Sequence, residues 1–252
     1  FRRRLGFGVR VAPEGDGWLQ DEDTLDTWFS SGSWTFSTLG WPDEAPDLAR
    51  FHPTDVLETG VDILFFWVAR MILMSQFVLG EIPFRTIYLH GLIRDAQGRK
   101  FSKSLGNGID PIEVINKFGA DAARMTLVVG NTPGTDMRLS EDRIKGYKHF
   151  ANKLWNITRF ILENTEGADL NAPRTDTDGA LEVALTELAL DVTKDLEEFR
   201  IYMAADKLYQ YAWSELAANI LEESKVILAG DDATAIASRK ATLRTLLTTT
   251  LV

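Results

Sequence analysis

A succession of strand, helix and strand patterns constrains the fold of this chain most. A short apolar run, Asp55–Thr59, is followed by the longest apolar run of the chain, Val61–Leu79, and then by Thr86–His90, which is rich in residues that favour strands. Gly60 and Gly91 end the two strand runs. This order predicts a βαβ unit of a parallel sheet, and therefore an α/β fold of the Rossmann type in this half of the chain.

The apolar run Val61–Leu79 is also close to the length that crosses a membrane. Asp62 and Arg70 interrupt it, and an unpaired Asp or Arg side chain in lipid is costly. We therefore predict a buried helix and no membrane partner. A membrane protein anchored by this segment remains the weakest alternative.

Ligands of parallel α/β sheets bind outside the carboxyl ends of the strands. Gly60 and His90 end the two predicted strands, and Asp62 lies in the first helical turn, where the positive end of the helix dipole favours a carboxylate. We expect these residues to gather at one edge of the sheet, together with the basic loop Gly98–Asn107.

This loop, called the lysine loop below (Gly98–Asn107), is short, cationic and rich in hydrogen-bond donors. Lys100 and Lys103 are three residues apart, with Ser102 between them. Such a loop can close over a polyphosphate, although a solvated basic turn has the same composition. It is not a Walker phosphate loop, because its glycines lie outside the lysines. Its place after a predicted strand favours a phosphate site.

The net charge of −10 is unevenly distributed along the chain. Residues 1–84 carry 6 basic and 13 acidic side chains, residues 85–160 carry 13 and 7, and residues 161–252 carry 8 and 17. The basic middle segment suits the phosphates of a nucleotide or of an RNA backbone, unless its charges only face solvent.

Cysteine and histidine usage excludes some classes of site. The chain has no cysteine, which excludes disulfides and thiolate metal sites and fits a reducing cytoplasm. His52, His90 and His149 lie far apart in the sequence, so we predict no metal site.

Beyond residue 130 the patterns are helical. Ser140 is positioned to cap a long helix, on which Phe150, Leu154, Ile157 and Ile161 recur at helical spacing. The polar stretch Asn164–Asp178 is typical of a linker. Residues 180–199, 201–229 and 233–252 then predict an antiparallel helix bundle, with one apolar stripe formed by Ile201, Ala205, Leu208, Ala212, Leu216 and Ile220. Residues 1–20 are rich in glycine and predict a hairpin or irregular segment.

The chain resembles the class I aminoacyl-tRNA synthetases, and within that family the valyl members. Lys100–Ser104 is similar to the KMSKS signature of the family, with Phe101 in place of Met. Ser30 and Ile63 stand where isoleucyl members typically have Asp and Gln, which favours the valyl branch. Four further segments are similar to segments of the valyl members and occur in the same order: Leu25–Ser31, Thr59–Met71, His90–Asp95 and Phe150–Asn156.

This resemblance implies a ligase that uses ATP, with Mg²⁺, to convert valine to valyl-adenylate and then transfers valine to tRNA(Val). Lys100 and Lys103 would be catalytic. The implied ATP-binding residues are Gly60, Asp62, His90, Gly91, Lys100, Ser102 and Lys103, and the implied valine pocket consists of Trp28, Ile63 and Trp67. The last three are otherwise ordinary core residues; Ile63 and Trp67 share a helix face because they are four residues apart.

The resemblance also implies a domain division. Residues 1–129 would be the C-terminal part of the catalytic domain, residues 130–164 a connecting region with a long helix, and residues 165–252 a truncated anticodon-binding bundle. The chain contains no His-x-Gly-His, the other ATP-binding signature of the family, and no editing domain. We therefore expect an internal fragment, inactive alone, of a monomeric cytoplasmic enzyme. Two alternatives stay open: a non-catalytic module that binds tRNA or another RNA, and an isoleucyl member of the family.

Overall fold

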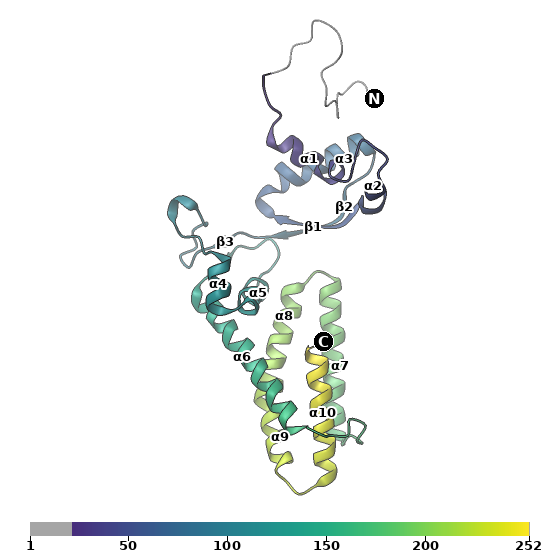
Figure 1. Cartoon of the computed structure of the whole chain (residues 1–252), viewed down its shortest axis with the longest axis vertical. Helices are drawn as coiled ribbons and strands as arrows, with labels where there is room; N and C mark the ends of the chain where they lie inside the picture. Colours follow the sequence, from purple (N-terminus) through teal and green to yellow (C-terminus); the bar gives the residue numbers. More distant parts are fainter. Residues whose placement is uncertain (1–21, 252) are drawn as a thin grey trace. The chain divides into compact units, whose positions relative to one another are not determined.

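The computed structural model describes residues 22–251, apart from the side chain of Lys103. The chain divides into two compact units (Figure 1). The first comprises residues 1–92 and 133–135, and the second comprises residues 93–132 and 136–252. The segment 1–20, for which the sequence predicts a hairpin or irregular structure, lies outside the described residues.

The first unit contains the predicted βαβ unit. Strand β1 (Thr54–Gly60) leads through a 3₁₀ turn (Val61–Ile63) and a π-helical turn (Leu64–Val68) into helix α3 (Ala69–Leu79), which β2 (Phe84–His90) follows. The two strands pair in parallel, from Thr54 opposite Phe84 to Gly60 opposite His90. Helix α1 (Thr27–Ser37) packs beside α3, and α2 (Pro46–Phe51) precedes β1 (Figure 1). The predicted α/β unit with a parallel sheet is confirmed.

The prediction of a buried helix between the strands is wrong. Val68 and Met71 pack against side chains of both strands and are 1% and 0% exposed, but Phe65 and Leu73 are 74% and 69% exposed. Only 17% of the most apolar stretch within Val61–Leu79 is buried, and by length and composition alone this segment is long and apolar enough to cross a membrane. A helix that is apolar on every side needs cover on every side, and residues 22–251 cover one side.

The second unit is helical apart from two short strands. β3 (Ile93–Arg94) pairs in parallel with β4 (Met137–Arg138), which the sequence patterns did not predict. The predicted helix caps are confirmed: Asp110 Oδ1 accepts from Ile112 N at 2.7 Å, and Ser140 Oγ accepts from Arg143 N at 3.3 Å. The helices are α4 (Pro111–Phe118), α5 (Ala120–Val128), α6 (Glu141–Asn164), α7 (Asp176–Glu197), α8 (Ile201–Gln210), α9 (Leu221–Leu228) and α10 (Ala233–Leu251), with the π-helical segment Tyr211–Ile220 between α8 and α9.

Helices α7 to α10 form the predicted bundle, and α6, predicted as a separate long helix, packs against it (Figure 1). Its core includes Leu216, which is fully buried, and the predicted stripe residues Ile157 and Ile161 of α6. The apolar stripe predicted for residues 201–220 is wrong at Ile201 and Leu208 on α8, which are 39% and 37% exposed. The π-helical segment explains the error, because its wider turns rotate the buried face relative to that of a regular α-helix.

The predicted linker Asn164–Asp178 is shorter than expected, since α7 begins at Asp176. Asp178 is only 2% exposed. Its carboxylate accepts from Arg239 Nε at 2.6 Å and from Ser238 Oγ at 2.5 Å, both on α10. Polar residues that the pattern assigned to a linker therefore attach the start of α7 to α10, through hydrogen bonds that offset the cost of burying the Asp178 carboxylate.

Candidate functional site

The carboxyl ends of β1 and β2 bring three predicted site residues together. Gly60 is directly opposite His90 in the parallel register. A Cβ atom at Gly60 would lie 2.6 Å from Asp62 Oδ1 and 3.5 Å from His90 Cε1. The carboxylate and the imidazole therefore lie beside the Gly60 position, where an added Cβ atom would displace the Asp62 carboxylate. The predicted gathering of these three residues is confirmed, whereas their roles stay predictions.

His90 is held by polar contacts on both ring nitrogens. Its Nε2 atom lies 3.2 Å from Glu58 Oε1, and its Nδ1 atom lies 2.8 Å from the carbonyl oxygen of Gly91. Gly91 is buried, and Asp62 is exposed. This edge thus offers a carboxylate and an imidazole next to bare backbone, an arrangement that suits a hydroxyl-bearing ring such as a ribose.

The three residues predicted to line the valine pocket lie on α1 and on the turns before α3. Trp28 stacks on Phe66 with ring centres 6.0 Å apart, and the Arg70 guanidinium lies 5.7 Å from the Trp28 ring centre. Trp67 donates from Nε1 to the carbonyl oxygen of Ser31 at 3.2 Å. Trp28, Ile63 and Trp67 are all half-buried. Their role as a pocket stays a prediction.

The lysine loop lies in the second unit and has a defined backbone conformation. Arg94 and Lys100 form an antiparallel bridge, and the turn between them places Gly98 at φ +82°, where a side chain would be strained. A short 3₁₀ turn, Lys103–Leu105, closes the loop. Ser102 Oγ and Ser104 Oγ are 2.7 Å apart.

Asp95 anchors the base of the loop and is only 7% exposed. Its Oδ1 atom accepts from Arg99 N at 2.8 Å and from Gln97 N at 3.1 Å, while Oδ2 accepts from Arg99 Nε at 2.8 Å and from Asn107 Nδ2 at 2.9 Å. The Asn107 amide first, and then the Arg99 donors and charge, lower the pKa of Asp95 from 3.8 to about 2, although burial opposes the shift. The carboxylate is therefore charged at neutral pH.

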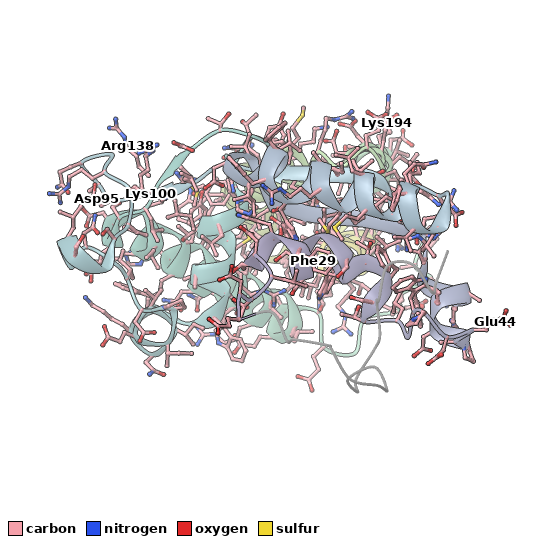
Figure 2. All side chains as sticks on the ribbon, turned by 90° about the horizontal axis from the view of Figure 1, so that it is seen from above. Phe29, Glu44, Asp95, Lys100, Arg138 and Lys194 are labelled. Carbon is pink, nitrogen blue, oxygen red and sulfur yellow. The ribbon has the colours of Figure 1, made fainter. Side chains whose placement is uncertain are left out.

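Further cations lie beside Lys100. The backbone of Arg94 is opposite that of Arg138 in the β3–β4 register and forms a β-bridge with Lys100. These three basic residues are therefore adjacent across the strands. Figure 2 shows Asp95, Lys100 and Arg138 close together. Arg94 is neutralised by Asp136. Among the described residues no carboxylate forms an ion pair with Arg138, whose guanidinium lies against Gly98. The three basic residues add positive charge beside the loop.

Asp95, Asn107 and Arg138 are the residues that sequence reasoning missed. The stretch Asp95–Gly98 has the Asp-x-x-Gly pattern of a turn in which the Asp side chain caps the backbone, and this signal was available. Nothing in the sequence indicated the pairing of β3 with β4 that brings Arg138 to the loop. Within residues 22–251, no three His, Cys, Asp or Glu side chains are grouped so that they could hold a metal ion.

Two family models match the chain. The model described as tRNA synthetases class I (I, L, M and V) matches residues 8–140, which is more than half of the chain. The chain belongs to the class I tRNA synthetases. A second model, the anticodon-binding domain of tRNA ligase, matches residues 178–252 of this synthetase chain.

Curated relatives of this synthetase chain are valine–tRNA ligases. The protein from Clostridium tetani is 49% identical over 220 residues, covering 85% of this chain and 25% of the relative. The protein from Streptococcus mutans is 46% identical over 249 residues, covering 93% of this chain and 28% of the relative. The chain thus spans about a quarter of the length of these relatives. Because these relatives are valine–tRNA ligases, the similarity favours the valyl over the isoleucyl branch.

Solved structures of class I synthetases share the fold of this chain. The Agrobacterium radiobacter K84 agnB2 LeuRS, crystallised with tRNA and LeuAMS, has a TM-score of 0.72 and 22% identity over 91% of this chain and 30% of its own. Methionyl-tRNA synthetase from Mycobacterium tuberculosis, bound by methionyl-adenylate, has a TM-score of 0.73 and 22% identity over 88% of this chain and 46% of its own. Both likenesses support a Rossmann-type unit followed by a helical region.

Proposed function

We propose that the protein to which this chain belongs is a valine–tRNA ligase, which converts valine and ATP to valyl-adenylate and transfers valine to tRNA(Val). The single observation that carries this proposal is the near-half identity to valine–tRNA ligases across most of the chain. It is consistent with Ser30 and Ile63, which depart from the isoleucyl pattern.

In this proposal the lysine loop binds the triphosphate of MgATP. Lys100 and Lys103 offset the negative charge that gathers on the phosphoryl oxygens when the valine carboxylate attacks the α-phosphorus, and Ser102 donates to the same oxygens. The valine oxygen forms the new bond to phosphorus, and pyrophosphate leaves. Positioned cations suffice for this step, because the transition state needs charge stabilisation rather than covalent help from the protein.

The β1–β2 edge takes the nucleoside. Gly60 and Asp62 hold the ribose, and His90 and Gly91 lie by the adenine. The Asp62 carboxylate, whose Oδ1 atom lies 2.6 Å from where a Cβ atom of residue 60 would be, supports this assignment, because it can accept a hydrogen bond from a ribose hydroxyl beside Gly60. Trp28, Ile63 and Trp67 form an apolar pocket for the branched side chain of valine. The Mg²⁺ ion arrives with ATP as part of the substrate.

The helical unit is proposed to bind tRNA. A groove of about 460 Å³ lies along α6, the π-helical segment and α9, and polar, charged, aromatic and aliphatic side chains line it. On its walls Lys153 Nζ lies 4.7 Å from the ring centre of Trp213, whereas Lys225 Nζ, 6.0 Å from the ring centre of Phe160, pairs with Glu222 Oε1 at 2.6 Å. Lys153 beside the face of Trp213 suits an RNA strand, with a phosphate on the lysine and a base near the ring.

The remaining assignments follow from this function. We place the parent protein in the cytoplasm as a monomer without a membrane partner, and we expect the 252-residue chain to be inactive alone. We keep the functional division into a catalytic part at residues 1–129, a connecting region at residues 130–164 and an anticodon-binding part at residues 165–252.

The test is ATP–pyrophosphate exchange by the complete gene product with single amino acids. We expect exchange with valine and at least tenfold less with isoleucine at equal concentration, followed by transfer of valine to tRNA(Val). Exchange with isoleucine but not with valine would overturn the substrate. A protein that binds tRNA with strong salt dependence but exchanges no pyrophosphate would instead be the non-catalytic module.

A further inference from the structure

The backbone of the lysine loop is fixed from one side by a single amide, that of Asn107. Its Oδ1 atom accepts from the Ser102 backbone N–H at 2.9 Å. Its Nδ2 atom donates to the Lys100 carbonyl oxygen at 3.3 Å and to Asp95 Oδ2 at 2.9 Å. The side chain therefore contacts the backbone on both sides of Phe101, between the two lysines.

Asp95 makes this contact rigid. Its carboxylate is only 7% exposed and is also bound by the Arg99 backbone N–H at 2.8 Å, by Arg99 Nε at 2.8 Å and by the Gln97 N–H at 3.1 Å. A charge-assisted hydrogen bond from a buried, fully bonded carboxylate orients its donor more strongly than a neutral partner can. Asn107 is thereby held with its oxygen facing Ser102.

We propose that Asn107 is the positioning residue of the lysine loop: it holds the backbone at Lys100 and Ser102 on the Asp95 carboxylate, so that the loop is shaped before phosphate binds. A preformed loop avoids the entropy cost of ordering flexible residues when the ligand arrives, and its cations stabilise developing charge without reorganisation. The proposal rests on the proposed function for its link to catalysis. The three hydrogen bonds of the Asn107 amide, to Asp95, Lys100 and Ser102, are called the bracket below, and they do not depend on that function.

The first measurement is amide hydrogen exchange of Ser102 in the 252-residue chain. Replacing Asn107 by Ala removes the acceptor of this N–H, and we expect its protection to fall at least tenfold. The matched control is Asn131→Ala, since Asn131 is also half-buried and its Nδ2 atom donates to the Leu127 carbonyl oxygen at 3.0 Å, outside the loop. Unchanged protection in Asn107→Ala would overturn the bracket.

The second measurement is valine-dependent pyrophosphate exchange by the complete gene product. In Asn107→Ala we expect kcat to fall about 10- to 100-fold while KM for valine stays within twofold, because the loop acts on the phosphates in the transition state. A residue that only stabilised the fold would also lower apparent kcat without changing KM, so kcat is expressed per folded molecule, with the folded fraction measured by circular dichroism on the same sample. Loss of Ser102 protection with wild-type kcat would overturn the positioning role.

Exchanging the side chains of Asn107 and Asp95 distinguishes loss of the bracket from a general disturbance of the fold. In Asn107→Asp two carboxylates face each other where Asp95 and Asn107 now lie 2.9 Å apart, and we expect a larger loss than with Ala. Adding Asp95→Asn restores one donor and one acceptor at this contact. We expect the double variant to recover at least tenfold in kcat over Asn107→Asp, and no recovery would contradict the proposal.

Failure of the function and failure of the bracket are distinguishable. A wild-type gene product without valine-dependent exchange removes the proposed function and, with it, the catalytic role of Asn107. The protection of the Ser102 amide then still decides whether Asn107 holds the loop.

Discussion

The two units differ in how their apolar helices are covered. In the helical unit Leu216 is fully buried, whereas on α3 in the first unit Leu73 is 69% exposed. Both leucines lie in apolar helical stretches that the sequence alone assigns to a core. This difference shows that an apolar sequence pattern identifies a helix that needs to be packed against other elements. Whether its side chains are buried depends on which elements are present to pack against them.

The largest expected effect is in the helical unit, at its buried ion pair. Arg239 is 1% exposed and donates from Nε to Asp178 Oδ1 at 2.6 Å. Arg239→Met leaves a buried carboxylate without its cation, and we expect a loss of about 3–5 kcal/mol in unfolding free energy. Urea unfolding followed by circular dichroism measures it. Adding Asp178→Asn removes the unpaired charge and should recover part of the loss; a single variant as stable as wild type would contradict the prediction.

A matched pair of substitutions tests the comparison directly. Leu216→Ala should cost about 2–5 kcal/mol, because it leaves a cavity in the bundle core. Leu73→Ala should change stability by no more than about 0.5 kcal/mol, because the side chain is largely in solvent. Both are measured by urea unfolding of the same chain. Equal losses of unfolding free energy in the two variants would show that the Leu73 side chain is buried in solution, and would contradict the difference between the two units.

The same contrast shows how far the sequence could predict the fold. The caps at Asp110 and Ser140 followed from signals of neighbouring residues, and the βαβ unit followed from the order of strand and helix patterns in one continuous stretch of sequence. The exposure of Leu73 did not, because it depends on distant elements. The π-helical segment Tyr211–Ile220 was also missed, since its residues are ordinary helix formers.

The candidate site divides in the same way. Gly60 and His90 were placed together correctly, because the ends of successive parallel strands meet at one edge. The contacts of Asp95 and Asn107, twelve positions apart, depend on the path of the loop between them, which no periodicity describes.

The next prediction concerns the strand edge. Gly60→Ala places a Cβ atom 2.6 Å from Asp62 Oδ1, so the carboxylate must move. We expect KM for ATP in pyrophosphate exchange to rise about 10-fold, the effect of losing one hydrogen bond to a charged group. Gly146→Ala on α6 is the matched control, because nothing lies within 4 Å of its added Cβ. Equal KM values for the two variants would remove Asp62 from the ribose site.

The smallest expected effect is the acid titration of Asp95. Its pKa is lowered from 3.8 to about 2, so its contribution to stability is complete above about pH 4 and is lost as pH falls toward 2. The Arg99 amide signal in NMR spectra reports this, since that N–H donates to Asp95 Oδ1 at 2.8 Å. We expect a titration midpoint near pH 2, and its absence in Asp95→Asn. A midpoint near pH 4 would mean that the carboxylate is not held.

The central claim is that the lysine loop binds the phosphates of ATP in a valine–tRNA ligase. The most direct measurement is valine-dependent pyrophosphate exchange by the complete gene product carrying Lys103→Ala. The control is Lys117→Ala, a lysine of the same basic segment that pairs with Glu141 at 2.6 Å. The account predicts a fall of about 10²- to 10³-fold in kcat for Lys103→Ala and less than twofold for Lys117→Ala. Equal activity in both variants would contradict it.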